Sequence, residues 1–126
     1  MSGGPNERAQ QLRAKLLRKE LYVIITTNVA PQEKLDEILH EHLEHQIRLE
    51  KEGIMFGAGP LFREDASRKC GMIIVRAASF AEARAIADRD PYHRSGMRTY
   101  TIDRWTMNEG SYTVTVNYSD QSVKIA

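Results

Sequence analysis

Hydrophobic and polar positions follow two different periods along this chain. Short runs of apolar or β-branched residues, each bounded by polar residues, glycine or proline, predict strands over residues 21–27, 54–62, 71–76, 99–107 and 112–118. Stretches in which apolar residues recur every three or four positions predict helices over residues 6–19, 31–51 and 79–90. The predicted order is therefore one helix, then β-α-β-β-α-β, then one added strand.

The middle of this order is the split βαβ arrangement, an α+β fold in which an antiparallel, ferredoxin-like sheet carries two helices on one face. A short polar turn separates the strands over 54–62 and 71–76, so we expect them to form a hairpin. Ser79 and Glu82 have the spacing of a capping box at the start of the second sheet-covering helix, and Pro91 ends that helix. The other face of the sheet has no helix, so we expect a second copy of the chain to cover it in a homodimer.

The length and composition exclude several classes of protein. A chain of 126 residues fits one domain over 21–107, with a helical extension over 1–20 and a strand extension over 108–126. Its 18 Lys and Arg against 17 Asp and Glu give a net charge of +1, so no global field favours nucleic acid or an anionic membrane. No apolar run approaches the roughly 20 residues that span a bilayer, and the first residues lack the apolar core of a secretory signal. We therefore expect a cytoplasmic protein whose single Cys70 is a strand residue and not a nucleophile.

The predicted helix over 31–51 carries polar side chains where core residues are expected. Its apolar residues on one face of the helical wheel are Leu35, Ile38, Leu39, Leu43 and Ile47. His42 and Gln46 fall on that same face. The strand that follows contains Gly57 and Gly59, whose missing side chains would leave floor space near the histidine. The sequence therefore predicts a small pocket between this helix and this strand.

His42 and Asp90 are the candidate catalytic residues. Asp90 stands at the end of the second sheet-covering helix, where the helix dipole disfavours a carboxylate, so a role other than stability is expected. If the two side chains meet, the carboxylate fixes one imidazole tautomer and leaves the other ring nitrogen free to move a proton. The competing interpretations are a hydrogen-bonded core histidine and an Asx turn before proline.

A metal site is a further competing interpretation of the same residues. His45 lies at the edge of the helix face that carries His42, and His93 follows Asp90 closely, so four ligands could gather. No HExxH or paired-cysteine pattern supports this interpretation, and we expect neither a metal nor an organic cofactor. No serine lies in the G-x-S-x-G turn of a serine hydrolase.

Three segments of the chain resemble the YCII-related family: EHLEHQIRLEKEGIMFGAGPL, AEARAIADRDPYH and TYTIDRW. The resemblance covers residues 21–107 and implies a small protein of the ferredoxin-like, dimeric α+β barrel type. The family's pattern falls on His42, Gly57, Gly59, Pro60, Asp90, Pro91 and Tyr92. What the resemblance implies is an active site in a cleft, centred on a histidine and an aspartate.

Two functions from different classes remain open. The first is a small enzyme, an isomerase or lyase without a cofactor, that performs proton transfer, isomerisation or elimination on a small metabolite, with aromatic and lactone-like compounds as candidates. The second is a non-catalytic ligand-binding or assembly module. An enzyme needs His42 to be reachable from solvent and bonded to a carboxylate, whereas a structural histidine would be sealed and bonded to backbone groups. The expected ligand contacts are Gly57, Gly59, Pro60, Tyr92, His93, Gln46 and His45.

Overall fold

The computed structural model describes residues 4–126, and the chain forms two compact units. One unit comprises residues 20–106, and the other joins the two ends of the chain, up to residue 19 and from residue 107 onward. Residues 1–3 of the expected N-terminal extension lie outside the described residues.

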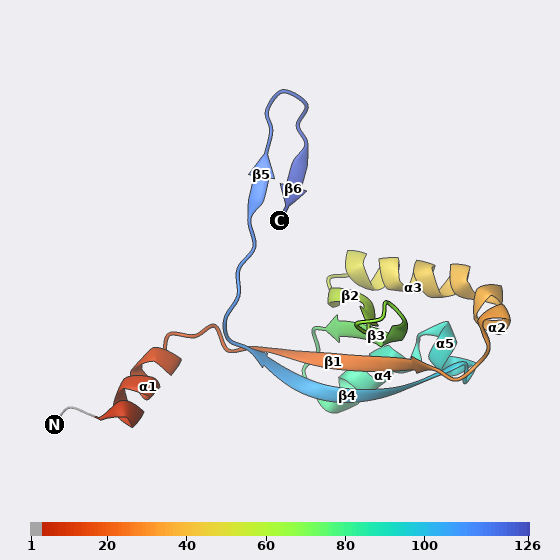
Figure 1. The fold of residues 1–126 in the computed structure, drawn as a ribbon, viewed down its shortest axis with the longest axis horizontal. Coiled ribbons are helices and arrows are strands. Elements are labelled where there is room, and N and C mark those ends of the chain that lie inside the picture. Colours follow the sequence, from red (N-terminus) through yellow and green to blue (C-terminus); the bar gives the residue numbers. More distant parts are fainter. Residues whose placement is uncertain (1–3) are drawn as a thin grey trace. The chain divides into compact units, whose positions relative to one another are not determined.

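The unit over residues 20–106 contains the sheet and the helices that the sequence predicts (Figure 1). Its elements in chain order are β1 (Lys19–Asn28), α2 (Gln32–Glu37), α3 (Leu39–Lys51), β2 (Met55–Phe62), β3 (Arg68–Val75), α4 (Phe80–Asp88), α5 (Pro91–Arg94) and β4 (Arg98–Met107). The strand order in the sheet is β2-β3-β1-β4, and β3 pairs antiparallel with both β1 and β2. This is the order of the split βαβ fold, so the predicted fold class is confirmed.

The two helices predicted for this unit are both shorter in the structure than expected, and a further short helix adjoins each of them. The first helix breaks at Ile38, whose backbone angles of φ −120° and ψ 16° are not helical, so α2 and α3 replace one continuous helix. The second begins at Ser79, whose Oγ accepts a hydrogen bond from the N–H of Glu82 at 3.1 Å. The carboxylate of Glu82 in turn accepts from the N–H of Ala78, one residue earlier than a capping box requires. This helix ends at Asp88, and Asp90 is the N-cap of α5.

The core lies between the sheet and the helices on one of its faces. Alternate residues of the two central strands supply the sheet side of this core, and α3 and α4 supply the other side. The buried residues are Tyr22, Ile24, Leu49, Ile73, Val75, Ala83, Ile86 and Ala87. Each large side chain among them contributes roughly 1.5–3 kcal/mol by leaving water, and together they hold α3 against the sheet.

The other face of the sheet is apolar and carries no helix. Val23 pairs with Ile74 and Ile25 with Met72, and these residues alternate with the core residues, so their side chains point away from the helices. Phe56 and Trp105, from the two edge strands, pack edge to face with ring centroids 6.5 Å apart, and Trp105 remains 37% exposed.

The terminal unit contains α1 (Pro5–Arg13), β5 (Val114–Val116) and β6 (Val123–Ile125). The prediction of one added strand over 112–118 is wrong, because β5 and β6 pair antiparallel as a separate hairpin. The short β6 follows a turn in which the carboxylate of Asp120 accepts a hydrogen bond from the N–H of Ser122, and three alternating residues gave too weak a pattern to predict it. The predicted helix over 6–19 ends earlier, at Arg13.

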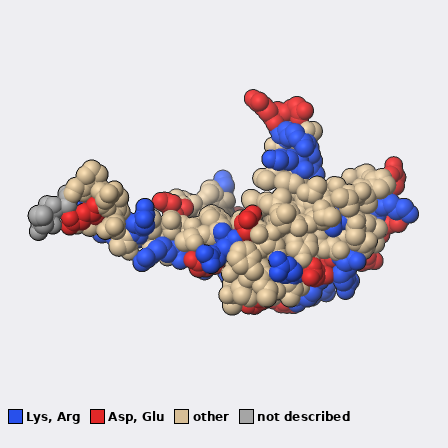
Figure 2. All heavy atoms as spheres, turned by 90° about the horizontal axis from the view of Figure 1, so that it is seen from below, with Lys and Arg blue, Asp and Glu red and all other residues tan. Residues whose placement is uncertain are grey.

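Charged side chains of both signs are interspersed over the face displayed in Figure 2, as the net charge of +1 leads one to expect. None of the helices within residues 4–126 has the length and apolar composition needed to traverse a bilayer. In the same part of the chain, no three His, Cys, Asp or Glu side chains are grouped so that they could hold a metal ion. The expected absence of a metal stays a prediction.

Candidate active site

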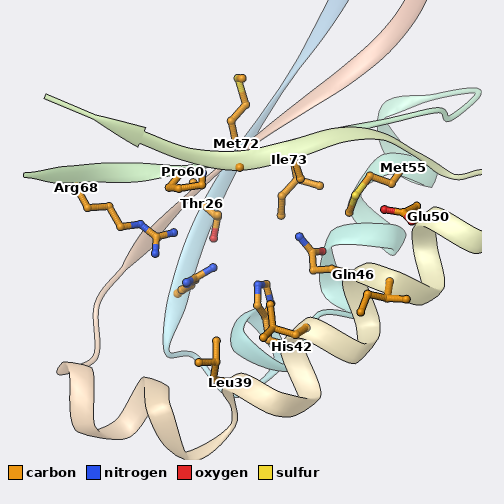
Figure 3. Close-up of a pocket in the computed structure, with 16 residues that line it drawn as sticks. Thr26, Leu39, His42, Gln46, Glu50, Met55, Pro60, Arg68, Met72 and Ile73 are labelled. Carbon is orange, nitrogen blue, oxygen red and sulfur yellow. The ribbon is translucent and has the colours of Figure 1, made fainter. Parts of the chain in front are cut away.

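A cavity of about 360 Å³ lies between α3 and the helix-covered face of the sheet (Figure 3). Its lining comes from α3, from all four strands and from the residues around them. The lining residues are Thr26, Leu39, His42, Leu43, Gln46, Ile47, Glu50, Met55, Ala58, Gly59, Pro60, Arg68, Gly71, Met72, Ile73 and Arg98. The volume falls within the range of small-ligand sites, and the lining combines an apolar wall with a few polar groups, as such sites do.

α3 turns a different face to the core from the one that its apolar pattern predicts. The core side of the helix carries His42, His45 and Leu49, all buried. Leu43 and Ile47 line the cavity instead and remain 49% and 51% exposed. The apolar stripe that was expected to face the core therefore forms a wall of the cavity. His42 and His45 lie on the core side of the helix, where leucines were expected.

His42 is bonded to the predicted carboxylate. Its Nδ1 lies 3.0 Å from Oδ1 of Asp90, and both side chains are buried. The histidine also lines the cavity, with 7% of its surface exposed. An ionised carboxylate only accepts hydrogen bonds, so Nδ1 carries the proton and Nε2 is the ring nitrogen left for other partners.

Asp90 has a structural role in addition to its contact with His42. It is the N-cap of α5, and its Oδ1 accepts a hydrogen bond from the N–H of Tyr92 at 2.9 Å. The expectation that it ends a helix in an unfavourable dipole is wrong, because α4 has already ended and the dipole of α5 favours the carboxylate. Its Oδ2 is buried and has no hydrogen-bond partner among residues 4–126.

The charge state of Asp90 follows from these contacts. Burial raises the pKa of the Asp90 carboxyl, but the hydrogen bond and charge of His42, followed by the N–H of Tyr92, outweigh burial and hold the pKa below its usual value. Asp90 is therefore ionised near neutral pH and can stabilise a positive charge on the imidazole.

Tyr92 does not line the cavity, but its ring packs against two residues that do. Its hydroxyl donates to the backbone carbonyl of Leu35 at 2.6 Å, which ties α5 to α2. Its ring lies 4.6 Å from the ring of His42, centroid to centroid, and 4.3 Å from the guanidinium carbon of Arg98. One buried ring therefore positions two polar groups of the cavity.

His93 also lies behind the cavity. Its Nδ1 is 2.7 Å from the carbonyl oxygen of Ala87, so this nitrogen donates, and its Nε2 accepts from the hydroxyl of Thr26 at 2.7 Å. Thr26 lines the cavity, so His93 acts through it. The expected ligand contact of His93 is thereby replaced by a supporting one.

His45 faces a different part of the surface. It borders a separate cavity of about 240 Å³ together with Arg48 and Arg89. Burial, opposed by the charge of Asp90 and assisted by these two arginines, lowers the pKa of His45. The structure therefore separates His45 from the cavity that His42 lines.

Of the two glycines predicted to form the pocket floor, Gly59 lines the cavity and Gly57 does not, and neither has its missing side chain on the cavity side. Gly57 pairs with Ile74 and Gly59 with Met72, so a side chain at either position would point to the helix-free face. Figure 3 shows Met72 directed away from the cavity and Ile73 directed into it. Gly59 contributes only its backbone to the lining, whereas Pro60 and Gln46 line the cavity directly.

Two arginines that line the cavity, Arg68 and Arg98, were missed by sequence reasoning. Arg98 begins β4 and is 8% exposed; its Nε donates to Oδ1 of Asn28 at 2.7 Å. Burial, followed by the positive charge of Arg68, lowers the pKa of Arg98. The available signal was strand alternation, which places Arg98 on the same face as the core-packed Tyr100 and Ile102.

The fold and the cavity define a small α+β protein with a ferredoxin-like sheet and a histidine–aspartate pair in a cleft. The sequence model of the YCII-related domain matches residues 21–106, so the chain belongs to the YCII-related family. No curated protein matches this chain.

Among the solved structures that share the fold is 5-chloro-2-hydroxyhydroquinone dehydrochlorinase (TftG) from Burkholderia phenoliruptrix AC1100, in complex with 2,5-dihydroxybenzoquinone. The two chains are 19% identical, with a TM-score of 0.55 over 68% of this chain and 93% of the other. At this identity the likeness shows that the two proteins share an α+β fold.

Proposed function

We propose that this protein is an acid–base enzyme that moves a proton on a small cyclic metabolite, with His42 as the catalytic base and acid. The observation that carries this proposal is the position of His42, which lines a cavity while its Nδ1 is bonded to a buried carboxylate. A structural histidine would be sealed and bonded to the backbone, and His42 is neither.

The chemistry follows from the two ring nitrogens. Asp90 accepts the Nδ1 proton and fixes the tautomer in which Nε2 has a free lone pair. Nε2 takes a proton from an acidic position of the substrate, and Asp90 stabilises the imidazolium that results. If the imidazolium returns the proton to another atom of the substrate, the reaction is an isomerisation. If a leaving group departs with its bonding electron pair, the reaction is an elimination.

The size and lining of the cavity favour a substrate with one ring. About 360 Å³ accommodates such a molecule, and an apolar wall that includes Leu43, Met55 and Ile73 provides contact for the ring. TftG, which shares the fold, is a dehydrochlorinase bound to a benzoquinone, which supports an aromatic or quinonoid substrate and an elimination for this chain as well.

Proton transfer is tested by hydrogen–deuterium exchange. The protein is incubated in D₂O with a panel of cyclic carbon acids, including hydroxyhydroquinones and lactones, and loss of C–H signals is followed by NMR. We expect the wild type to accelerate exchange in at least one compound and His42→Gln to reduce that rate by about 10²–10⁴-fold, as loss of a general base does.

A matched control is available on the same helix. His40 is exposed and pairs with Glu44, so His40→Gln should leave the exchange rate unchanged. Binding of 2,5-dihydroxybenzoquinone without exchange of any panel compound, and with equal affinity for wild type and His42→Gln, would instead favour the non-catalytic ligand-binding module.

We also propose that the protein acts as a homodimer through the helix-free face of its sheet. This face presents Val23, Ile25 and Met72 next to the Phe56–Trp105 pair, which supports an apolar interface with a second copy.

A further inference from the structure

Two arginines face the cavity that His42 lines, and we infer that together they hold an oxyanion of the substrate, either a carboxylate or the ionised oxygen of an enol or phenol. This inference rests on the proposed acid–base function and names the class of substrate that the site takes.

Arg98 is a buried cation that forms no ion pair with a carboxylate of residues 4–126, although the negative charge of Asp90 acts on it from a greater distance. Within residues 4–126, the one hydrogen bond of its guanidinium is the Nε–H bond to Asn28, and none of the ion pairs includes it. The two terminal amino groups are therefore left for another acceptor. A charged group is rarely buried unless it is paired, because its loss of hydration is costly.

The position of Arg98 is fixed before any ligand arrives. Asn28 ends β1 and Arg98 begins β4, the neighbouring strand. Their hydrogen bond therefore joins the ends of two adjacent strands. The ring of Tyr92 packs against the guanidinium at 4.3 Å. A guanidinium held in this way presents its planar fork to an oxyanion without further loss of side-chain entropy.

Arg68 adds a second positive charge to the same end of the cavity. It comes from β3, and its side chain points into the cavity in Figure 3. In the described residues it takes part in no ion pair either. Two like charges that face one space repel each other, and an anion between them removes the repulsion and accepts bonds from both.

The remaining charges of the cavity agree with this orientation. Glu50 is the acidic residue of the lining, and Figure 3 shows it at the opposite end from Arg68. Asp90 is engaged by His42 and by the N–H of Tyr92. The cavity therefore has a cationic end near His42, where an oxyanion that develops during proton removal is stabilised by fixed donors.

The inference is tested with benzoate and its neutral isostere benzamide. Affinities are measured by NMR titration at fixed ionic strength. We expect benzoate to bind the wild type about tenfold or more tightly than benzamide, and Arg98→Gln to remove this preference by weakening benzoate alone. Arg104→Gln, a substitution at an exposed arginine of the same strand, should change neither affinity.

Because removal of a buried side chain can prevent folding, Arg68→Gln provides a second test. Arg68 is exposed at the start of β3, and its substitution should also weaken benzoate severalfold without affecting benzamide. Equal binding of the two compounds by the wild type, or an unchanged preference for benzoate in both arginine variants, would overturn the inference.

His42→Gln separates this inference from the proposed function. The variant should retain the benzoate preference, because the arginines bind the anion without the imidazole. If the wild type exchanges no panel compound but prefers benzoate through Arg98, the inference stands and the proposed reaction fails. If exchange depends on His42 while benzoate binding ignores both arginines, the inference alone fails.

Discussion

At the scale of single residues, Asp90 serves the fold and the site with the same oxygen atom. Its Oδ1 caps α5 through Tyr92 and also accepts the bond from His42. The Asx turn and the histidine–aspartate pair, which the sequence offered as alternatives, are therefore both present. A substitution of Asp90 would disturb α5 as well as the histidine, so His42 is the better position for a test.

His42→Gln tests the coupling through the pH dependence of stability. The folded-state pKa of Asp90 lies below its usual value near 3.8 because the contributions of His42 and Tyr92 outweigh burial. A depressed carboxyl pKa contributes stability that is present above the unfolded value and is lost as the pH falls through the folded pKa. We expect the variant to be about 2 kcal/mol less stable than the wild type at neutral pH.

This difference should narrow below a pH of about 4, where the unfolded carboxyl becomes protonated. Urea unfolding of both proteins at neutral pH and at acid pH measures it. A difference of the same size at both pH values would mean that the imidazole and the carboxylate are not coupled.

The sequence revealed only part of this site. His42 could be predicted because a polar residue on an apolar helix face is an exception to a local pattern. Asp90 was predicted from a helix-end position that the structure does not have, and from the resemblance to the YCII-related family. Strand alternation places Arg98 and Thr26 on the core face of the sheet, but it does not show that they meet in a cavity. Their role depends on pairing between β1 and β4, which residue order does not specify.

At the scale of elements, the rotation of α3 decides which of its residues meet the cavity. The helix lies over the sheet with His45 and Leu49 toward the core, and its leucine and isoleucine stripe borders the cleft. The hydrophobic pattern predicted the helix itself but not this rotation, because a cleft wall and a core face are equally apolar. The same limit explains why the glycines were placed on the wrong face. The alternating pattern predicted β2 as a strand, but it did not show which face of the sheet the side-chain positions of Gly57 and Gly59 lie on.

The burial of His45 predicts a loss of stability in weak acid. Burial, with the nearby charges of Arg48 and Arg89, lowers the pKa of His45 despite the opposing charge of Asp90. The unfolded chain then binds a proton as the pH falls through about 6.5 while the folded chain does not, so stability decreases between 6.5 and the lower folded pKa.

His45→Gln removes this titration. We expect the stability difference between mildly alkaline and weakly acid solution to shrink in His45→Gln relative to the wild type, whatever the cost of the substitution itself. Urea unfolding at the two pH values measures the change, and His40→Gln, a substitution at an exposed histidine, serves as the control. An unchanged pH difference in His45→Gln would show that its burial does not govern its charge.

At the scale of the whole molecule, the helix-free face is the feature that a single chain leaves unexplained. β1 and β3 contribute Val23, Ile25, Met72 and Ile74 to it, and Gly59 adds a flat position beside Met72 with open space around its missing side chain. Apolar sheet faces of this kind are covered in folded proteins, and here the two sheet-covering helices occupy the opposite face.

A homodimer through this face gives the last prediction. Light scattering should return twice the chain mass of 14.4 kDa at micromolar concentration. Met72→Glu places a charge at the centre of the face, where burial without a partner is costly, and should yield a protein of 14.4 kDa. Met72 lines the cavity with its backbone while its side chain points away from it, so the monomeric variant should keep the benzoate preference. Arg84→Glu, on the exposed side of α4, should remain dimeric. If light scattering gives the wild type the mass of a single chain, the homodimer proposal is wrong. The apolar face on this side of the sheet would then need another explanation.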